Sequence, residues 1–395
     1  MPVINRIAEF HDEITAWRRH IHENPGLLYD VEHTARFVAE KLKEFGCDEI
    51  VSGIGRTGVV GIIKGRSDGE TVGLRADMDA LPIQEKRDLP HKSKVDGKMH
   101  ACGHDGHTAM LLGAAKYLAE TRNFEGSVAV IFQPAEEGGA GGKAMCDDQM
   151  MERFGITEVY GMHNRPGLPV GEFEIRAGGI MAGTDEFTVT IEGLGAHAAM
   201  PHLGNDPIQI AAQMVSAFQT IVSRNVDPLK NAVVSVTAIH AGQAYNVIPQ
   251  DAKFWGTVRT LDGEVRDTVL ARIQEIAKGF EAAYGAKIDV RIKEGYPVTF
   301  NHATETEHAA AVAREVVGND RVDVDTPPVM GGEDFSFMLL ERPGAFIFVG
   351  NGDTAGLHHE EYDFNDEAIP TGVSYWVTLA ERRLEALAGS RTEVA

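Results

Sequence analysis

The sequence predicts an α/β protein with a smaller α+β domain inserted into it. Several short runs are apolar at every position rather than alternating, which is typical of strands covered by helices on both faces of a sheet. Residues 184–295 instead follow the order βαββαβ, the ferredoxin-like arrangement. The 395 residues also exceed the roughly 250 to 300 at which a single core stops growing. We therefore expect one domain built from residues 1–183 and 296–395, interrupted by a second of residues 184–295.

Two amphipathic helices are predicted at the start of the chain. The first has an apolar residue at every third or fourth position and ends before Pro25. Its apolar face consists of Ile7, Phe10, Ile14, Trp17 and Ile21. The second covers residues 32–45, and the glycine after it suits the left-handed conformation that follows many helix ends.

The strands of the predicted sheet come next, with helices between some of them. The apolar runs cover residues 71–81, 127–134, 158–164 and 344–350, and residues 105–120 read as a helix. The inserted domain has strand patterns at 185–193, 232–242, 252–260 and 287–295 and helical patterns at 208–224 and 266–285. The earlier α/β style resumes at Tyr296.

Charge and composition exclude several classes of partner. Asp and Glu number 59 against 37 for Lys and Arg, and the resulting net charge of -22 repels nucleic acid and anionic membranes. No window reaches the ~18 apolar residues of a membrane span. The first residues lack the apolar core of a secretory signal, and three cysteines form no disulfide framework. We expect a cytoplasmic protein.

Polar residues directly follow the apolar runs, where parallel sheets gather function at the carboxyl ends of strands. The chain also has one Cys-x-His pair, in the stretch MHACGHDGH. Thiolate, imidazole and carboxylate groups together suit one or two divalent ions such as zinc. The residues concerned are Asp77, Asp79, Cys102, His104, Glu136, Glu137, His163, His358 and His359.

The adjacent glutamates indicate a hydrolytic site. Such a site needs one carboxylate to bind metal and another to move a proton between water and leaving group. At the turn after a strand both side chains can reach the same site, and the glycine run after Glu137 permits a tight turn.

Each signal alone also has a structural interpretation. A single Cys-x-His pair is a weak motif, His163 fits a buried core histidine, and a Glu pair is common on a solvated face. GIGRTG at 53–58 is better interpreted as a turn than as a phosphate loop. Two other functions stay open: a cysteine hydrolase in which His107 or His104 activates Cys102, and a metal-binding module without catalysis.

Motifs along residues 70–370 resemble one enzyme family. They are RADMDALP, HACGHDGHTAMLLGAA, FQPAEEGGAGGKAM, GMHNRPGLPVG, GAHAAMPH, YNVIPQDA, GTVRT, MGGEDFS and LHHEEYDFND. Together they are similar to the hippurate hydrolase, N-acyl-amino-acid and auxin-conjugate amidohydrolase family of metallopeptidases. The resemblance implies a zinc-peptidase-like catalytic domain with a mixed, largely parallel sheet, and an inserted lid domain that mediates dimerisation.

The resemblance also implies roles for individual residues. Glu136 matches the general acid/base, His197 the lid histidine that polarises the scissile carbonyl, and Asp79 and Asp105 groups that orient ligands. His358 is preferred to His359 because the first histidine of the family's LH motif is the ligand. The residues that match metal ligands are Cys102, His104, Glu137, His163 and His358.

One departure concerns the segment after the histidines. Glu360 and Glu361 stand where the family usually has a proline, which predicts a less rigid loop and a more acidic site. A substrate carboxylate would then need a cation or amide partner, for which Asn246 and Arg259 in the lid are candidates.

The implied reaction is hydrolysis of N-acylated amino acids of the hippurate, N-acetyl or N-aroyl type. Auxin conjugates, N-acetyl-diaminopimelate and dipeptides are alternative substrates for the same site. Two divalent ions per subunit are implied, and zinc, manganese, cobalt or nickel would suit such ligands. The expected assembly is a homodimer through the lid, with a small-molecule substrate as the other partner.

Overall fold

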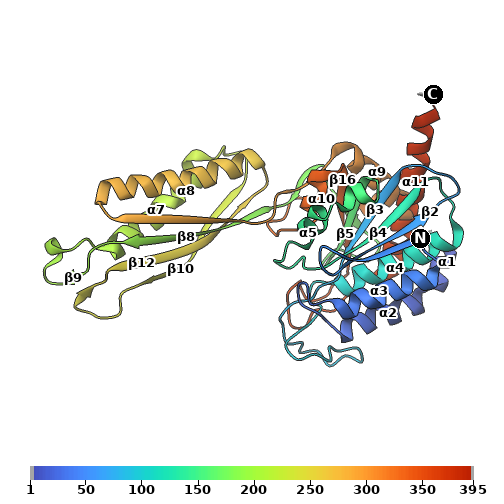
Figure 1. Cartoon of the computed structure of the whole chain (residues 1–395), viewed down its shortest axis with the longest axis horizontal. Coiled ribbons are helices and arrows are strands. Elements are labelled where there is room, and N and C mark those ends of the chain that lie inside the picture. The colour runs from blue at the N-terminus through green and yellow to red at the C-terminus, as the bar shows by residue number, and fades with distance from the viewer. Residues whose placement is uncertain (1–3, 393–395) are drawn as a thin grey trace. The chain divides into compact units, whose positions relative to one another are not determined.

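The computed structural model of the chain describes residues 4–392 and divides them into two compact units (Figure 1). Unit 1 contains residues 4–178, 300–327 and 334–392. Unit 2 contains residues 179–299 and 328–333. The predicted insert of residues 184–295 lies within unit 2, which gains the short segment 328–333 from the second half of the chain.

The core of unit 1 is an eight-stranded mixed sheet in the order β1-β2-β4-β3-β5-β16-β6-β15. The four central strands β4, β3, β5 and β16 are mutually parallel, whereas β1 and β2 pair antiparallel at one edge. The predicted mixed, largely parallel sheet is therefore confirmed. Its strands are β1 Glu49–Ile54, β2 Gly58–Lys64, β3 Thr71–Asp77, β4 Ser127–Gln133, β5 Ile156–Arg165, β6 Phe173–Glu174, β15 Val322–Asp323 and β16 Gly344–Gly350.

Helices cover both faces of this sheet, because alternate side chains of each strand point to opposite faces. Leu74 of β3 packs in one core with α4, whereas its neighbour Arg75 faces Phe335 at the start of α10. The helices are α1 Asn5–Glu9, α2 His11–Glu23, α3 Glu32–Phe45, α4 His104–Thr121, α5 Gly141–Asp147, α6 Met150–Arg153, α9 Ala303–Val317, α10 Ser336–Glu341 and α11 Ile369–Thr392. Two 3-10 turns lie at Asn319–Arg321 and Asp366–Ala368.

The N-terminal helical segment corrects the prediction of a single helix. It is divided into α1 and α2 at Phe10, whose backbone N–H bonds to the oxygen of Ile7 at 3.0 Å. This three-residue spacing tightens the backbone and ends the regular α-helical ladder. All five apolar residues predicted for its buried face are buried, from Ile7 to Ile21.

The other sequence patterns of unit 1 agree with the structure. α3 ends at Gly46, which has a φ of 79° and therefore the expected left-handed conformation. The stretch 53–58 forms the tight connection between the antiparallel strands β1 and β2, as predicted for a turn. The largely apolar character of β3, β4 and β16 corresponds to burial of almost every residue in them.

Unit 2 has the βαββαβ order predicted for it. Its antiparallel sheet has the order β10-β12-β8-β13, with α7 and α8 packed on each other and on the sheet. Its core contains Phe187, Phe218 and Phe254 in edge-to-face contact. The elements are β8 Gly183–Glu192, β9 Ala196–His197, a 3-10 turn at Pro201–Leu203, α7 Pro207–Asn225, β10 Ala232–Ala241, β11 Val247–Ile248, β12 Asp251–Thr260, α8 Gly263–Tyr284 and β13 Lys287–Glu294. Two short strands, β7 Gly178–Met181 and β14 Thr299–Asn301, each run across the boundary between the units.

The helices of both units are too short or too polar for a lipid bilayer. Within residues 4–392, none combines the length and the apolar character that a membrane-crossing helix needs.

Candidate active site and metal centre

The carboxyl ends of the central strands of unit 1 bring the candidate ligands together. Their side-chain ligand atoms form overlapping groups in which all atoms lie within 4.8 Å of one another. The five residues that match metal ligands all belong to unit 1, although they come from positions as far apart as 102 and 358. The groups that contain them include Cys102 with His104 and His163, Cys102 with Glu137 and His358, and His104 with Glu136 and Glu137.

The Cys-Gly-His spacing reflects a tight turn into a helix. Gly103 precedes α4 with a φ of 89°, and a Cβ there would lie 2.2 Å from Nδ2 of Asn164 and 2.5 Å from the hydroxyl of Tyr362. Only glycine fits this conformation and this space. The turn leaves Cys102 and His104 on the same side, and Cys102 Sγ lies 3.4 Å from Nε2 of His163.

The two buried histidines of the cluster are held in the same tautomer. His104 Nδ1 donates to the backbone oxygen of Asp79 at 2.8 Å, and His163 Nδ1 donates to that of Asn164 at 2.7 Å. The other ring nitrogen, Nε2, is thereby directed into the cluster. Within the described residues Nε2 of His104 is buried without a hydrogen-bond partner, which is the arrangement expected of a nitrogen that binds metal.

The charges around His104 also favour a cation. Burial lowers the pKa of His104, but the charge of Asp77 and the hydrogen bond to Asp79 outweigh burial and raise it to about 10. Burial and the neighbouring His107 hold the pKa of His163 well below its ordinary value, so this imidazole is neutral. A negative environment with a neutral imidazole and a thiol fits zinc and its first-row neighbours.

The two glutamates face the same cluster because the chain turns sharply after β4. Ala135 has a φ of 55°, a left-handed conformation that is uncommon outside glycine. The carboxylate of Asp79 accepts hydrogen bonds from the backbone N–H groups of the two residues after Ala135, Glu136 at 2.9 Å and Glu137 at 3.1 Å. Asp79 therefore orients the glutamates through their backbone and His104 through its own carbonyl oxygen.

His358 reaches the cluster from a loop after β16. Its φ of 62° is strained for a histidine, and its backbone N–H donates to the oxygen of Ala101 at 2.7 Å. Its Nε2 lies 3.2 Å from Oε1 of Glu137. Glu360, which stands where the family usually has proline, pairs with Lys86 at 2.6 Å, so an ion pair tethers this loop.

The environment of Cys102 is unfavourable for a nucleophile. Burial, together with the charges of Glu137 and Glu136, raises the pKa of its thiol well above the ordinary value, whereas nucleophilic cysteines have a lowered pKa. Both ring nitrogens of His107 have other partners: Nδ1 donates to Asp77 at 2.7 Å and Nε2 accepts from the backbone of Asn164 at 2.9 Å. His107 is thus occupied in orienting Asp77 and Asn164.

A buried network of charged side chains lies beneath the cluster and was not predicted from the sequence. Arg75 of β3 donates to Asp77 at 2.8 Å, to Gln133 at 2.9 Å and to Asp334 at 3.0 Å. Asp334 also accepts from the backbone of Gly142 at 2.8 Å. The signal that could have revealed it is the charged pair Arg75 and Asp77 inside an otherwise apolar strand.

Asp105 lies beside the cluster but contacts a different set of residues. Its Oδ2 is 2.8 Å from Nδ1 of His22 and 3.5 Å from Arg18, both on α2. No hydrogen bond or ion pair joins it to a candidate ligand among residues 4–392. An effect of Asp105 on the candidate ligands would therefore act through the position of α4. Its role in orienting them stays a prediction.

The candidate residues of unit 2 fall at two separate places. His197 in β9 pairs with Val247 in β11, and the backbone of Asn246 bonds to Ala198, so His197 and Asn246 are neighbours. The backbone N–H of Ala199 donates to Nδ1 of His197 at 3.0 Å, which leaves the ring proton on the exposed Nε2.

Arg259 lies at the far end of β12 from this pair. β12 begins at Asp251, and the residue before it, Gln250, accepts a backbone hydrogen bond from Gly193. Because Gly193 lies four residues before His197, the start of β12 is at the His197 end of unit 2. Arg259 is eight residues further along the strand, a rise of roughly 26 Å. Within one unit 2, Arg259 and the pair His197–Asn246 are too far apart to contact the same small molecule.

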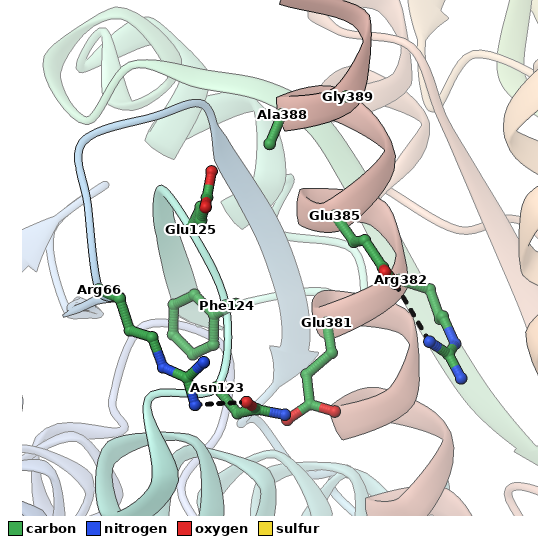
Figure 2. Close-up of a pocket in the computed structure, with 9 residues that line it drawn as sticks. All are labelled: Arg66, Asn123, Phe124, Glu125, Glu381, Arg382, Glu385, Ala388 and Gly389. Atoms are coloured by element: carbon green, nitrogen blue, oxygen red, sulfur yellow. Dashed lines mark hydrogen bonds and ion pairs between the residues drawn. The ribbon is translucent and has the colours of Figure 1, made fainter. Parts of the chain in front are cut away.

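A hollow of about 500 Å³ lies at the opposite, amino-terminal ends of β3 and β4 (Figure 2). Both of its arginines have partners: Arg66 bonds to Asn123 at 2.5 Å, and Arg382 to Glu385 at 3.1 Å (Figure 2). None of the candidate ligands lines it, and functional groups of parallel sheets gather at the other ends of the strands. The cluster around Cys102 is therefore the candidate site.

Comparison with known proteins agrees with this geometry. Residues 73–382 match the model of peptidase family M20/M25/M40. A hippurate hydrolase from Campylobacter jejuni is 43% identical over 98% of this chain and 100% of its own length. An N-acetylcysteine deacetylase from Bacillus subtilis is 40% identical over 96% of this chain and 98% of its own.

A solved structure shares the fold across both units. It is a dinuclear metal-binding peptidase of the M20 family from Bacillus subtilis, with a TM-score of 0.84 and 37% identity. The similarity covers 96% of this chain and 99% of that one. With this full-length similarity and a buried thiol, imidazole and carboxylate cluster, the chain belongs to peptidase family M20/M25/M40 and is a metal-dependent amidohydrolase.

Proposed function

We propose that the enzyme hydrolyses N-acylated amino acids to a carboxylate and a free amino acid. The observation that carries this proposal is the cluster of Cys102, His104, Glu137, His163 and His358, of which Cys102, His104 and His163 are buried, beside the buried Glu136. The names of the two relatives, a hippurate hydrolase and an N-acetylcysteine deacetylase, support a substrate with an acyl group on the amine of an amino acid. Auxin conjugates, N-acetyl-diaminopimelate and dipeptides carry the same kind of bond and are the alternatives.

The proposed division of labour follows from the ligand chemistry. Cys102, His104, Glu137, His163 and His358 would hold two divalent ions, for which zinc, manganese, cobalt and nickel are candidates. Bound ions of this kind polarise a carbonyl group and lower the pKa of water. No residue of the cluster other than Glu136 is then needed for proton transfer.

Glu136 is the proposed general base and acid. It takes a proton from the attacking water as the new C–O bond forms at the amide carbon. It then delivers that proton to the amide nitrogen as the C–N bond breaks, which releases the amine. The clamp of Asp79 on the backbone of Glu136 favours this role, because it fixes the start of the side chain beside the cluster.

His197 is the proposed donor to the carbonyl oxygen. The proton on its Nε2 is available for a hydrogen bond that strengthens as negative charge develops on that oxygen. Asn246 and Arg259 are proposed to bind the substrate carboxylate. Because roughly 26 Å of β12 separates them within one subunit, both can serve one site only if two subunits contribute.

We accordingly infer a homodimer formed through unit 2. β10 is an edge strand of ten residues whose second half is mostly exposed, and a long bare edge can pair with another chain. Ile239, 51% exposed on this strand, would lie in such an interface. Changing Ile239→Lys should give monomers in analytical ultracentrifugation, whereas Leu229→Lys, at an exposed loop position, should leave the dimer intact.

A cytoplasmic location is part of the same proposal. All three cysteines are free thiols, as expected in a reducing compartment. Cys102 in particular must stay reduced to serve as a ligand.

The decisive experiment is hydrolysis of N-acetyl, N-benzoyl and indoleacetyl amino acids by chelated protein, before and after zinc, manganese or cobalt is added back. Activity that disappears with chelation and returns with metal would establish the reaction, and the best acyl and amino-acid combination would identify the substrate. Activity that survives verified metal removal would instead assign catalysis to Cys102. Tight metal binding without hydrolysis of any substrate would leave a binding module.

A further inference from the structure

A buried arginine near the start of the chain contacts the segments that carry two of the candidate metal ligands. Arg18 of α2 is fully buried. Its guanidinium contacts three carboxylates: Asp366 at 2.7 Å, Asp363 at 3.0 Å and Asp105 at 3.5 Å. A planar guanidinium presents its donors in a fixed fork, a geometry that the compact ammonium of lysine on its flexible stem does not reproduce.

These carboxylates flank two of the candidate ligands. Asp105 directly follows His104 at the start of α4, and Asp363 and Asp366 follow His358 on the same loop. The two ligands are therefore tied to one cation on a third element, α2. This connection is independent of the cluster itself, because Arg18 touches no candidate ligand in the described residues.

The His358 loop depends on such tethers more than the other ligand-bearing segments do. His104 lies on a buried helix and His163 on a central strand, whereas residues 351–365 have no regular secondary structure. His358 itself has a strained backbone and a half-exposed side chain. Two backbone hydrogen bonds, from His358 to Ala101 and from Lys86 to Glu360, hold the middle of the loop, and side-chain contacts hold its end.

We propose that Arg18 is a positioning residue for the metal centre, which holds the His358 loop at the distance from His104 that two ions require. It acts through Asp363 and Asp366 on one side and Asp105 on the other. The inference rests on the proposed function, since it assumes that His358 is a ligand.

The chain offers a matched control for loss of a buried arginine pair. Arg383 of α11 is also buried and forms a two-point pair with Glu158 at 2.7 and 2.9 Å. Glu158 lies at the start of β5, away from the ligand end of that strand. Arg18→Lys and Arg383→Lys therefore remove similar interactions, only one of which is connected to the ligands.

The test measures zinc bound per subunit of full-length protein equilibrated at a series of fixed free zinc concentrations. His358→Ala is the reference for loss of a ligand. We expect Arg18→Lys to resemble it, with binding of one ion weakened about 10- to 100-fold, the usual effect of disturbing groups around a metal ligand. Arg383→Lys should bind zinc like the natural protein, although thermal unfolding of both metal-free variants should show lost stability.

Each result has a defined meaning. If Arg18→Lys binds zinc as Arg383→Lys does while His358→Ala loses an ion, the positioning role is wrong and the proposed metal centre stands. If the natural protein binds no zinc, manganese or cobalt, both proposals fail together. Should Arg18→Lys not fold, Asp363→Asn combined with Asp366→Asn removes this tether from the loop side, together with the contacts of the two carboxylates to His91 and Arg19, and must weaken zinc binding at least as much.

Discussion

Glu136 and Glu137 show how identical neighbouring side chains can receive different roles. Their backbone N–H groups share one acceptor, the carboxylate of Asp79, which keeps both residues at the end of β4. Beyond that common anchor only Glu137 lies beside His358, at 3.2 Å. The two side chains therefore differ in their neighbours and in the direction in which they point, and not in residue type.

This difference makes a testable prediction for the two glutamates. Glu136→Gln should lower turnover by about 100- to 10,000-fold, because the amide cannot transfer a proton, while the metal content stays at the natural level. Glu137→Gln should lose metal as well as activity. Elemental analysis beside steady-state kinetics would measure both, and loss of metal from Glu136→Gln would contradict the assignment.

His22 predicts how stability depends on pH. Burial lowers the pKa of His22, but the charge and hydrogen bond of Asp105 outweigh burial and raise it to about 9, above the ordinary 6.5. The stabilisation is therefore fully present below pH 6.5 and is lost as the pH rises through about 9. The shift corresponds to on the order of 3 kcal/mol.

The measurement is urea unfolding of chelated protein between pH 6 and 9.5. The free-energy difference between the natural protein and His22→Gln should shrink over this interval. A difference that stays constant with pH would show that folding does not shift the pKa of His22.

At the scale of elements, Asn164 connects the end of β5 to the start of α4. Its backbone N–H donates to His107, its side-chain amide donates to the oxygen of Cys102 at 2.6 Å, and its Oδ1 accepts from Tyr362 at 2.8 Å. Gly103 is what allows this approach. The strand, the helix and the His358 loop thus meet at one close contact.

Gly103→Ala should consequently disrupt both folding and metal binding. The new methyl group would meet Asn164 at 2.2 Å in a backbone conformation that already disfavours it. Gly46→Ala is the control, since Gly46 has a similar φ of 79° but open space around it. Urea unfolding should show a loss of about 1 kcal/mol for Gly46→Ala and clearly more for Gly103→Ala. Equal losses would mean that the contact with Asn164 is unimportant.

The sequence predicted the elements better than the connections between them. His163, Glu136 and Glu137 could be found because they directly follow apolar strand patterns, and strand ends meet at one edge of a parallel sheet. The left-handed Ala135, the break at Phe10 and the partners of Arg18 could not be found. They depend on backbone angles and on contacts between residues hundreds of positions apart, which no periodicity records.

At the scale of the whole molecule, the two units have separate hydrophobic cores, and every candidate ligand belongs to unit 1. A ligand stabilises only the part of a protein that binds it in the folded state. The stability of unit 2 should therefore be independent of metal.

Calorimetry can test this separation. We expect two thermal transitions. Zinc removal should lower the free energy of unfolding for only one of them, by about 2.7 kcal/mol or more relative to protein with zinc at 100 times its dissociation constant. A control on the separately expressed unit 2 would identify the other transition. A single transition, or two that shift equally, would show that the units unfold together.

The position of β16 in the sheet has a consequence for the time course of synthesis. This strand, Gly344–Gly350, lies between β5 and β6, which precede it by more than 150 residues. Most of unit 2 is contiguous in the chain and can fold while translation continues. The central sheet instead lacks the strand between β5 and β6 until residue 350 has left the ribosome. His358 follows a few residues later, so a nascent chain completes its sheet before it presents the last candidate ligand.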